Sequence, residues 1–373
     1  DLVARIAALP EMDAVIVEGD GARGRSLKAP APHEPVVPSA TTLLVPLAAC
    51  DALGQPLSQE TAHRLERVAA LTKLAPGDVI TPQVVAAVLA HPQGGRKNAP
   101  PGARVVPLLN KVEGKDGLAG AREVARLLLG TPAIERVLLA AVAMDDPVQE
   151  VWGRVAAVVL AAGASQRFGQ PKQLLPWGGK TMVEHVVDVL LASPVDEVIV
   201  VLGCQAEAVG AALGERPVQT VVNDGWDRGL SSSVRAGLGA VSPHAMAALF
   251  VLADQPGLTP DLVGRLIERH RRTLGPIVAP FYKSRRGNPV LFDRALFPEL
   301  AALEGDVGGR VLIEEHPQWV ERVEVETEEV LLDVDTPEEY ARGRMQEVGG
   351  SERRPHETEQ SSKLRGSGDL PLG

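Results

Sequence analysis

The chain has 373 residues, which is too many for one ordinary domain and suits two. Hydrophobic residues make up 45% and aromatic residues 3%, so aliphatic side chains can fill cores and a chain that stays unfolded is excluded. The formal net charge of −10 argues against nucleic acid as a partner, because binding a phosphate backbone requires a basic surface.

Membrane association and thiol chemistry are disfavoured as well. No apolar run is long enough to span a bilayer and we find no signal peptide, so we expect no membrane partner and a cytoplasmic location. Cys50 and Cys204 lie far apart, and neither has metal-ligand spacing around it. We therefore predict that both are reduced residues that serve packing.

The first half of the chain alternates strand and helix patterns. Three apolar runs predict strands: AVIVEGDGA from Ala14, a run from Val105 to Glu113 and another from Arg136 to Ala143. Two or three helical segments separate the first two runs, which predicts a parallel α/β layer. The chain opens at Asp1 inside the helical pattern LVARIAAL, so we expect an N-terminal piece to be missing.

A domain boundary is predicted near Gln149 to Gly153. A fresh strand opens at Val155 behind a short connector, and we find no sign of a sheet shared between the halves. The predicted domains are therefore residues 1–148 and 154–345. Residues 346–373 are rich in Gly, Ser, Glu and Arg and poor in apolar side chains, which predicts a disordered tail.

The second half predicts an α/β domain with a doubly wound, mostly parallel sheet of the Rossmann type. Strand and helix patterns alternate, and such a fold binds ligands at the carboxyl ends of its strands. Strands are expected at 155–160, 197–203, 218–223 and 248–254, and helices at 182–191, 206–213, 231–241 and 261–272.

The loop behind the first of these strands, LAAGASQRFGQPK, has a phosphate-binding pattern. Small residues let backbone N–H groups approach phosphate oxygens, and cations neutralise charge that shifts onto a leaving group. For a lone glycine-rich turn, a tight connection whose cations face water is the commoner explanation. The candidates for nucleotide binding in this loop are Leu160, Ala161, Ala162, Gly163, Arg167 and Lys172.

Carboxylates are expected at the same carboxyl edge of the sheet as this loop, and they favour phosphate binding over a simple tight connection. The strand 248–253 is followed by Asp254, where Mg²⁺ that bridges phosphates would need an oxygen ligand, and Asp335 is a second candidate. A simple turn at Asp254 and a helix start around Asp335 are the alternatives. Together with the loop, the pattern favours a catalytic set of Arg167, Lys172 and Asp254.

These elements resemble the MobA-like nucleotidyltransferases, specifically the molybdenum cofactor cytidylyltransferase branch. The motifs LAAGASQRFGQPKQLL, NDGWDRGLSSSVRAG, ADQP, GNPVLF, GDVGGR and LLDVDTPEEY carry the resemblance. Together they span essentially all of Val155 to Tyr340, which makes the resemblance specific.

The resemblance implies a reaction and roles for residues. The terminal phosphate of molybdopterin would attack the α-phosphorus of CTP, so that CMP is transferred and pyrophosphate leaves. The product would serve the maturation of molybdenum hydroxylases, which makes an apo-hydroxylase a possible partner. Gly163, Arg167 and Lys172 would bind the triphosphate of CTP, and Asp254 with Asp335 would hold Mg²⁺.

The resemblance also favours CTP over GTP. Ala162 stands where the guanylyl-transferring branch has a second glycine, and Pro171 to Leu175 match the cytidylyl branch. A methyl group at Ala162 would narrow the floor on which the base rests. Three alternatives remain open: a GTP-using transferase, a transferase of this fold with another acceptor, and a molybdopterin-binding chaperone for an apo-hydroxylase.

Two polar segments are further candidates for substrate contact. Asn223, Ser231 and Ser232 precede a helix and suit contact with base, ribose or pterin, although an N-cap role is an alternative for Ser231. Gly305 and Asp306 belong to a glycine-rich loop, which either closes over the pterin side or is ordinary exposed loop.

The first half resembles the selenium-dependent hydroxylase accessory family of YqeC type, through VIVEGDGARGRSLK and APAPHEPVVP. That resemblance implies a P-loop-like nucleotide-binding domain whose phosphate-binding loop precedes the segment that begins this chain. Either the sequence is truncated or the domain is a binding module. Glu18 and Asp20 are metal-facing candidates, and Asn110 to Glu113 is similar to a guanine-reading element. For the stretch HEPVVP, a rigid extended loop packed by prolines is at least as good an explanation as a catalytic use of His33.

Overall fold

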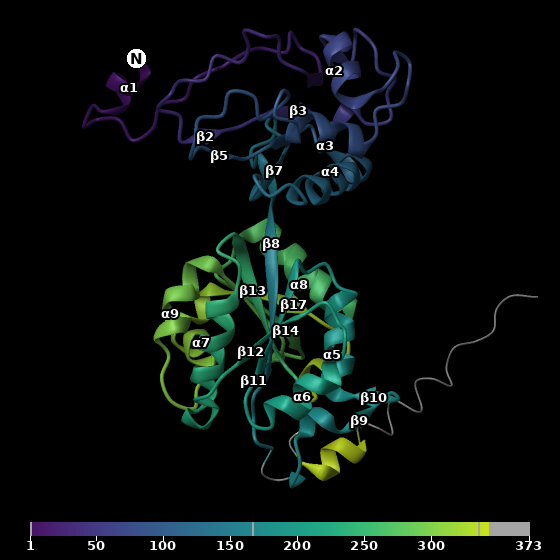
Figure 1. The fold of residues 1–373 in the computed structure, drawn as a ribbon, viewed down its shortest axis with the longest axis vertical. Helices are drawn as coiled ribbons and strands as arrows, with labels where there is room; N and C mark the ends of the chain where they lie inside the picture. Colours follow the sequence, from purple (N-terminus) through teal and green to yellow (C-terminus); the bar gives the residue numbers. More distant parts are fainter. Residues whose placement is uncertain (1, 166–167, 335, 343–373) are drawn as a thin grey trace, which may run out of the picture.

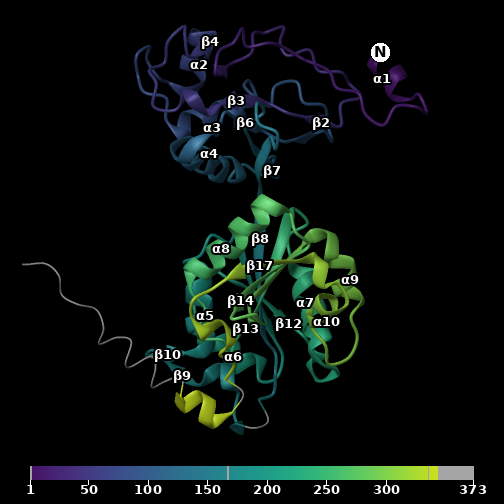
Figure 2. The same ribbon diagram turned by 180° about the vertical axis from the view of Figure 1, so that it is seen from behind.

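The computed structural model describes residues 2–165, 168–334 and 336–342, so the predicted tail at 346–373 lies outside them. Two α/β halves are joined by one long strand, β8 (Val148–Ala161), which runs from the first half into the centre of the second (Figures 1 and 2). No helix within the described residues is long and apolar enough to cross a bilayer.

The first half is a small sheet covered by helices. Strands β3, β6 and β7 are parallel, as predicted, and the core is built around Leu109, Leu128 and Leu139. The helices are α1 (Leu2–Ala7), α2 (Leu65–Thr72), α3 (Pro82–Ala90) and α4 (Gly114–Leu129). The strands are β1 (Leu27–Lys28), β2 (Leu43–Leu44), β3 (Leu47–Ala49), β4 (Ala62–His63), β5 (Arg104–Val105), β6 (Leu108–Asn110) and β7 (Arg136–Ala140).

The strand predicted from Ala14 is not formed. This segment is extended but pairs with no strand in the described ranges, and Ile16 is 98% exposed. An apolar run becomes a strand only where a neighbouring strand satisfies its N–H and C=O groups. The run from Val105 is also shorter than expected, because it divides into β5 and β6.

The second half is the predicted doubly wound, mostly parallel sheet. Its strand order is β12-β11-β8-β13-β16-β14, in which β16 is antiparallel to both of its neighbours. The strands are β9 (Pro176–Trp177), β10 (Lys180–Thr181), β11 (Glu197–Leu202), β12 (Gln219–Val222), β13 (Ala245–Leu252), β14 (Ile277–Tyr282), β15 (Arg285–Arg286), β16 (Val290–Asp293) and β17 (Val320–Glu324).

Helices cover both faces of this sheet. Helices α5, α6 and α8 pack on one face, and α7, α9 and α10 pack on the other (Figures 1 and 2). Their bounds are α5 (Met182–Leu191), α6 (Ala206–Leu213), α7 (Leu230–Ala240), α8 (Pro260–Thr273), α9 (Phe297–Ala302) and α10 (Arg310–Glu315). Val155 to Val159, in the central strand, are all fully buried, as expected for a parallel strand with helices on both faces.

The connector predicted at Gln149 to Gly153 is instead part of β8. Residues 148–153 pair antiparallel with β7, and residues 154–161 pair parallel with β11 or β13, so one sheet does cross the junction. Gly153 marks a close approach rather than a break, because a Cβ there would lie 2.7 Å from Arg136 Nη1 and 2.8 Å from Met246 Cβ. The two hydrophobic cores nevertheless divide here, at Trp152 and Val155, and we keep the two-domain division as a proposal.

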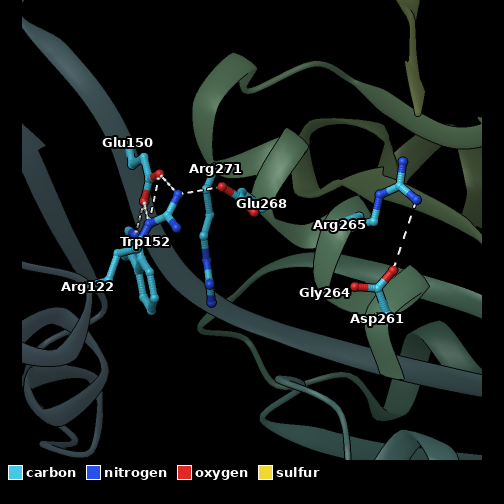
Figure 3. Close-up of a pocket in the computed structure, with 8 residues that line it drawn as sticks. All are labelled: Arg122, Glu150, Trp152, Asp261, Gly264, Arg265, Glu268 and Arg271. Atoms are coloured by element: carbon cyan, nitrogen blue, oxygen red, sulfur yellow. Dashed lines mark hydrogen bonds and ion pairs between the residues drawn. The ribbon is translucent and has the colours of Figure 1, made fainter. Parts of the chain in front are cut away.

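A polar network joins the halves across this junction (Figure 3). Glu150 is 1% exposed, and both of its oxygens accept hydrogen bonds of 3.1 Å from Nε of Arg122 in α4. Arg122 also reaches Glu268 of α8 at 2.5 Å. Burial raises the pKa of Glu150, but the hydrogen bonds from Arg122 and Trp152 outweigh burial and hold that pKa below its usual value.

The same network carries a cation stacked on an aromatic ring. The guanidinium of Arg271, in α8, lies 3.6 Å from the centre of the Trp152 ring, and Trp152 Nε1 donates to Glu150 at 2.8 Å. Burial lowers the pKa of Arg271 to about 10. These side chains line a cavity of about 260 Å³ between the two halves.

We predict that Arg122→Ala destabilises the protein by about 2–3 kcal/mol, because it leaves the buried Glu150 carboxylate without its main partner. The value is below that of a fully buried pair because Arg272 remains 3.5 Å from Glu150. Denaturant unfolding measures the change. Arg126→Ala, which removes an exposed arginine of the same helix, is the matched control, and equal losses for both variants would contradict the assignment.

A second charged cluster holds α5 against the neighbouring segments. Thr181 and Glu184 form a capping box at the start of α5. Asp188, in the same helix, accepts a hydrogen bond of 2.6 Å from Arg216 Nε and pairs with Lys180. The hydrogen bond from Arg216 is the main cause that lowers the pKa of Asp188 to about 2.

We predict that Asp188→Asn lowers stability at neutral pH by about 1–2 kcal/mol, a value reduced for the partial exposure of the site. A carboxyl group with a lowered folded-state pKa stabilises the fold above its unfolded pKa, near 4, and loses this effect as the pH falls to about 2. The difference in unfolding free energy between wild type and variant should therefore shrink between pH 4 and pH 2. A constant difference over that range would refute the assignment.

Candidate active site

Three parallel strands end at one edge of the second-half sheet. Leu160 lies beside Val201 of β11 and beside Leu252 of β13, so the loops that follow β8, β11 and β13 leave the sheet at the same level. This edge is at the end of β8 that lies away from the first half (Figure 1). It is the position at which a doubly wound sheet binds its ligands.

The loop behind β8 is held in shape by a buried glutamine. Gln173 is 3% exposed, and its Nε2 donates to the carbonyl oxygens of Ala161 at 3.1 Å and Gly163 at 3.0 Å. The hydroxyl of Ser165 donates to Gln173 Oε1 and accepts the backbone N–H of Lys172 at 2.9 Å. Sequence analysis missed Gln173, whose only signal is a polar residue inside the otherwise apolar stretch after the lysine.

The small residues of the loop differ in what they expose. Ala161 and Ala162 are buried, Leu160 is half-buried against the α7 face of the sheet, and Gly163 is exposed. A Cβ added to Gly203 would lie 2.7 Å from the methyl group of Ala162. The methyl therefore packs against Gly203, and its contact with a base stays a prediction.

The predicted lysine and aspartate meet at this edge. Lys172 Nζ forms an ion pair with Asp254 Oδ2, and their side chains are 19% and 10% exposed. Lys172 lies in the short 3₁₀ helix behind the loop, whereas Asp254 lies in the turn after β13. The other two predicted members, Arg167 and Asp335, lie outside the described residues.

The turn around Asp254 carries an unsatisfied oxygen. Gln255 is 6% exposed, its Nε2 donates to Asp333 at 2.5 Å, and its Oε1 is buried without a hydrogen-bond partner in the described part of the chain. Carboxylate and amide oxygens are the donors that Mg²⁺ prefers, so this oxygen beside Asp254 suits a hard cation. No group of three or more acidic, histidine or cysteine side chains forms a metal cage within the described ranges.

The polar cluster formed by Asn223 and the first turn of α7 is buried and internally hydrogen-bonded. Asn223 Nδ2 donates to the hydroxyls of Ser232 at 2.8 Å and Ser233 at 3.1 Å, and the Ser231 hydroxyl donates to the carbonyl of Gly305 at 2.7 Å. The N-cap of α7 is Gly229, so the N-cap alternative for Ser231 does not hold. Contact of Asn223, Ser231 and Ser232 with a nucleotide stays a prediction.

The glycine-rich loop around residue 305 is fastened to this cluster. Gly229 has φ +101°, and a Cβ there would lie 2.5 Å from the carbonyl oxygen of Gly305. Asp306 Oδ1 accepts the backbone N–H of Leu230 at 3.1 Å. The loop therefore forms one wall of the edge beside the start of α7.

The first-half candidates form a separate group of ion pairs. Lys28 pairs with Asp20 at 2.7 Å and with Glu34 at 3.0 Å, whereas Glu18 is exposed. The side chain of His33 is 78% exposed. Asn110, from the element similar to a guanine reader, accepts the backbone N–H of Val142 at 3.2 Å. Both cysteines are free, as predicted.

Comparisons with known proteins divide the chain in the same way. Residues 1–66 match the YqeC protein family. A protein of that name from Escherichia coli is 37% identical over 102 residues, which are 27% of this chain and 40% of that protein. The chain thus spans less than half of that relative, and any activity of the first half is a matter for proposal.

The second half matches relatives along nearly their whole length. Molybdenum cofactor cytidylyltransferase of E. coli is 26% identical over 186 residues, which are 49% of this chain and 92% of that protein. Nicotine blue oxidoreductase of Paenarthrobacter nicotinovorans is 40% identical over 197 residues, which are 50% of this chain and 95% of that protein. Residues 157–320 match the MobA-like NTP transferase domain, and through this half the chain belongs to the MobA-like NTP transferase family.

Proposed function

We propose that the second half transfers CMP from CTP to molybdopterin and releases pyrophosphate. The observation that carries the proposal is the Lys172–Asp254 ion pair beside a loop of small residues, at the sheet edge where this fold binds ligands. The similarity to molybdenum cofactor cytidylyltransferase supports the choice of nucleotide and acceptor. Delivery of the product to an apo-hydroxylase belongs to the same proposal.

The residues of the site fit a divalent cation, which we take to be Mg²⁺. Asp254 would hold it with Asp335, and we propose that Gln255, which follows Asp254 in the chain and whose Oε1 has no partner in the described ranges, assists directly or through water. Such sites commonly use one or two carboxylates together with substrate phosphates, so a full protein cage is not required. When bound, the cation supplies positive charge to the phosphate oxygens.

The chain's own residues would position and neutralise the nucleotide. Lys172 neutralises Asp254 in their ion pair. We infer that the lysine turns to the β- and γ-phosphates when nucleotide binds, and there offsets the charge that collects on departing pyrophosphate, a role that we also propose for Arg167. Gly163 and its neighbours would offer backbone N–H groups, in the loop shape that Gln173 maintains.

An oxidoreductase is a second candidate from another class. The observation that favours it is the 40% identity to nicotine blue oxidoreductase, which exceeds the 26% identity to the cytidylyltransferase. In that case the same edge would bind the phosphates of a redox nucleotide. Pyrophosphate release from CTP and molybdopterin, measured beside the oxidation of NADH and NADPH with an electron acceptor dye, separates the two functions.

We predict that Asp254→Asn lowers the rate of pyrophosphate release by at least about 100-fold, because an amide is a poor ligand for the cation. The fold should persist, since Lys172 loses a partner but stays near solvent. The matched control is Asp261→Asn, an acid that is 81% exposed on α8. Near-normal turnover of Asp254→Asn at saturating Mg²⁺ would remove the metal assignment.

We predict that CTP outcompetes GTP in the wild-type protein. Ala162→Gly should change this preference by less than the roughly 10-fold that a methyl group in contact with substrate provides, because the methyl faces Gly203. The measurement is pyrophosphate release with both nucleotides present, followed by separation of the two products. A wild-type preference for GTP would overturn the cytidylyl assignment and leave the family assignment standing.

A further inference from the structure

A second cation lies at the same sheet edge, on the far side of Asp254 from the phosphate loop. Arg286 ends the short strand β15, two residues before Asn288, which leads into β16. Strands β13 and β16 are antiparallel, with Phe250 beside Val290, so the residues just before β16 emerge where β13 ends. Arg286 and Asp254 are therefore both placed at this edge, each four residues beyond that pair.

The side chain of Arg286 belongs to the face of the sheet that carries α7 and α10. Arg286 pairs directly with Phe281, and residues opposite each other in an antiparallel ladder point to the same face. Phe281 packs in the hydrophobic cluster that includes Val234 of α7 and Leu312 of α10. Arg286 is thus on the side where the start of α7 and the loop around Gly305 form their wall.

Arg286 is half-buried, and its guanidinium has only weak hydrogen-bond partners. Its hydrogen bonds are two contacts of 3.4 Å, to the carbonyl of Gly287 and to Asn288 Oδ1. Within residues 2–165, 168–334 and 336–342 it forms no ion pair. Burial is the main cause that lowers its pKa, the charge of Arg310 lowers that pKa further, and the carboxylates of Glu314 and Asp333 oppose the shift without overcoming it. A partly buried guanidinium with no carboxylate within ion-pair distance is suited to an anion supplied by a ligand.

The neighbouring arginines on this face are already engaged. Arg310 is exposed and pairs with Glu314 at 2.5 Å within its own helix, and Arg235 donates to the backbone carbonyl of Leu303. Arg285, next in sequence to Arg286, is exposed and points to the opposite face because side chains alternate along a strand. Arg286 is the member of this group that combines burial, weak partners and a place at the edge.

We propose that Arg286 binds the phosphate monoester of the acceptor substrate and sets it opposite the nucleotide. This inference rests on the proposed transferase function. An oxygen of the acceptor phosphate would form a bond to the α-phosphorus of CTP while the bond from that phosphorus to the α,β-bridging oxygen breaks, and pyrophosphate carries away the electron pair. Arg286 reduces the repulsion between the two phosphates and holds the acceptor with two parallel N–H donors.

The kinetic test compares Arg286→Gln with Arg285→Gln in the full chain. Arg286→Gln should raise KM for molybdopterin by about 10–100-fold and leave KM for CTP within about twofold, since it removes charge-assisted hydrogen bonds to one substrate only. Arg286→Lys should give an intermediate KM, because it keeps the charge but loses the fork geometry. Arg285→Gln should behave as wild type. Unchanged KM for molybdopterin in Arg286→Gln would overturn the inference.

A binding test separates this inference from the proposed function. Inorganic phosphate is titrated calorimetrically into protein saturated with CTP and Mg²⁺, so that the nucleotide loop is already filled. Saturable binding should occur in wild type and Arg285→Gln and be lost in Arg286→Gln. If wild type releases no pyrophosphate but shows this pattern, the anion site stands and the transferase function falls. If phosphate binds equally to all three proteins or to none, the inference falls. Thermal melting checks each fold, and Arg286→Lys decides the outcome if Arg286→Gln melts early.

Discussion

Strand β8 is the constraint on which both halves depend. Its first residues complete the small sheet of the first half, and its later residues form the centre of the transferase sheet. Because side chains alternate along a strand, a shift by one residue would exchange the side chains on the two faces of the sheet and disrupt their packing against the helices. The close approach at Gly153 and the buried carboxylate of Glu150 hold this register at the point where the two cores meet.

The length of β8 also separates the junction from the candidate site. Fourteen residues in a strand extend about 45 Å, with the first half at one end and the ligand-binding edge at the other. Helix α8 runs in the opposite direction to β8. It begins shortly after Asp254, and Arg271 in its last turn packs on Trp152. The first half is thus attached at the opposite end of the transferase strands and does not cover the candidate ligand-binding edge (Figure 1).

Two cations at that edge differ in how well they are paired. Lys172 is neutralised by Asp254, while Arg286 has weak partners in the described structure. Phosphates from two substrates would supply the missing negative charge, one on each side of the aspartate. One fold can carry different functions, and relatives of the second half are named as a transferase and as an oxidoreductase.

The sequence by itself determined the α/β class, the four parallel strands expected between Val155 and Asp254, and the loop that ends at Lys172. These features depend on local periodicity and on the order of strand, small residues and cation, which neighbouring residues specify. It also placed Asp254 at the correct edge, because parallel strands end together.

Only the tertiary structure showed that β8 runs through the predicted connector, how the loop is supported and where the second cation lies. In the sequence, the segment that contains Glu150 and Trp152 has the pattern of a connector. In the structure it is part of β8, where Arg122 and Arg271, from distant parts of the chain, contact these two side chains. The run around Ile16 has the composition of a core strand, yet no strand in the described ranges pairs with it. The roles of Gln173 and Arg286 depend on which carbonyls and carboxylates lie nearby. Such contacts join residues far apart in sequence, and local pattern carries no information about them.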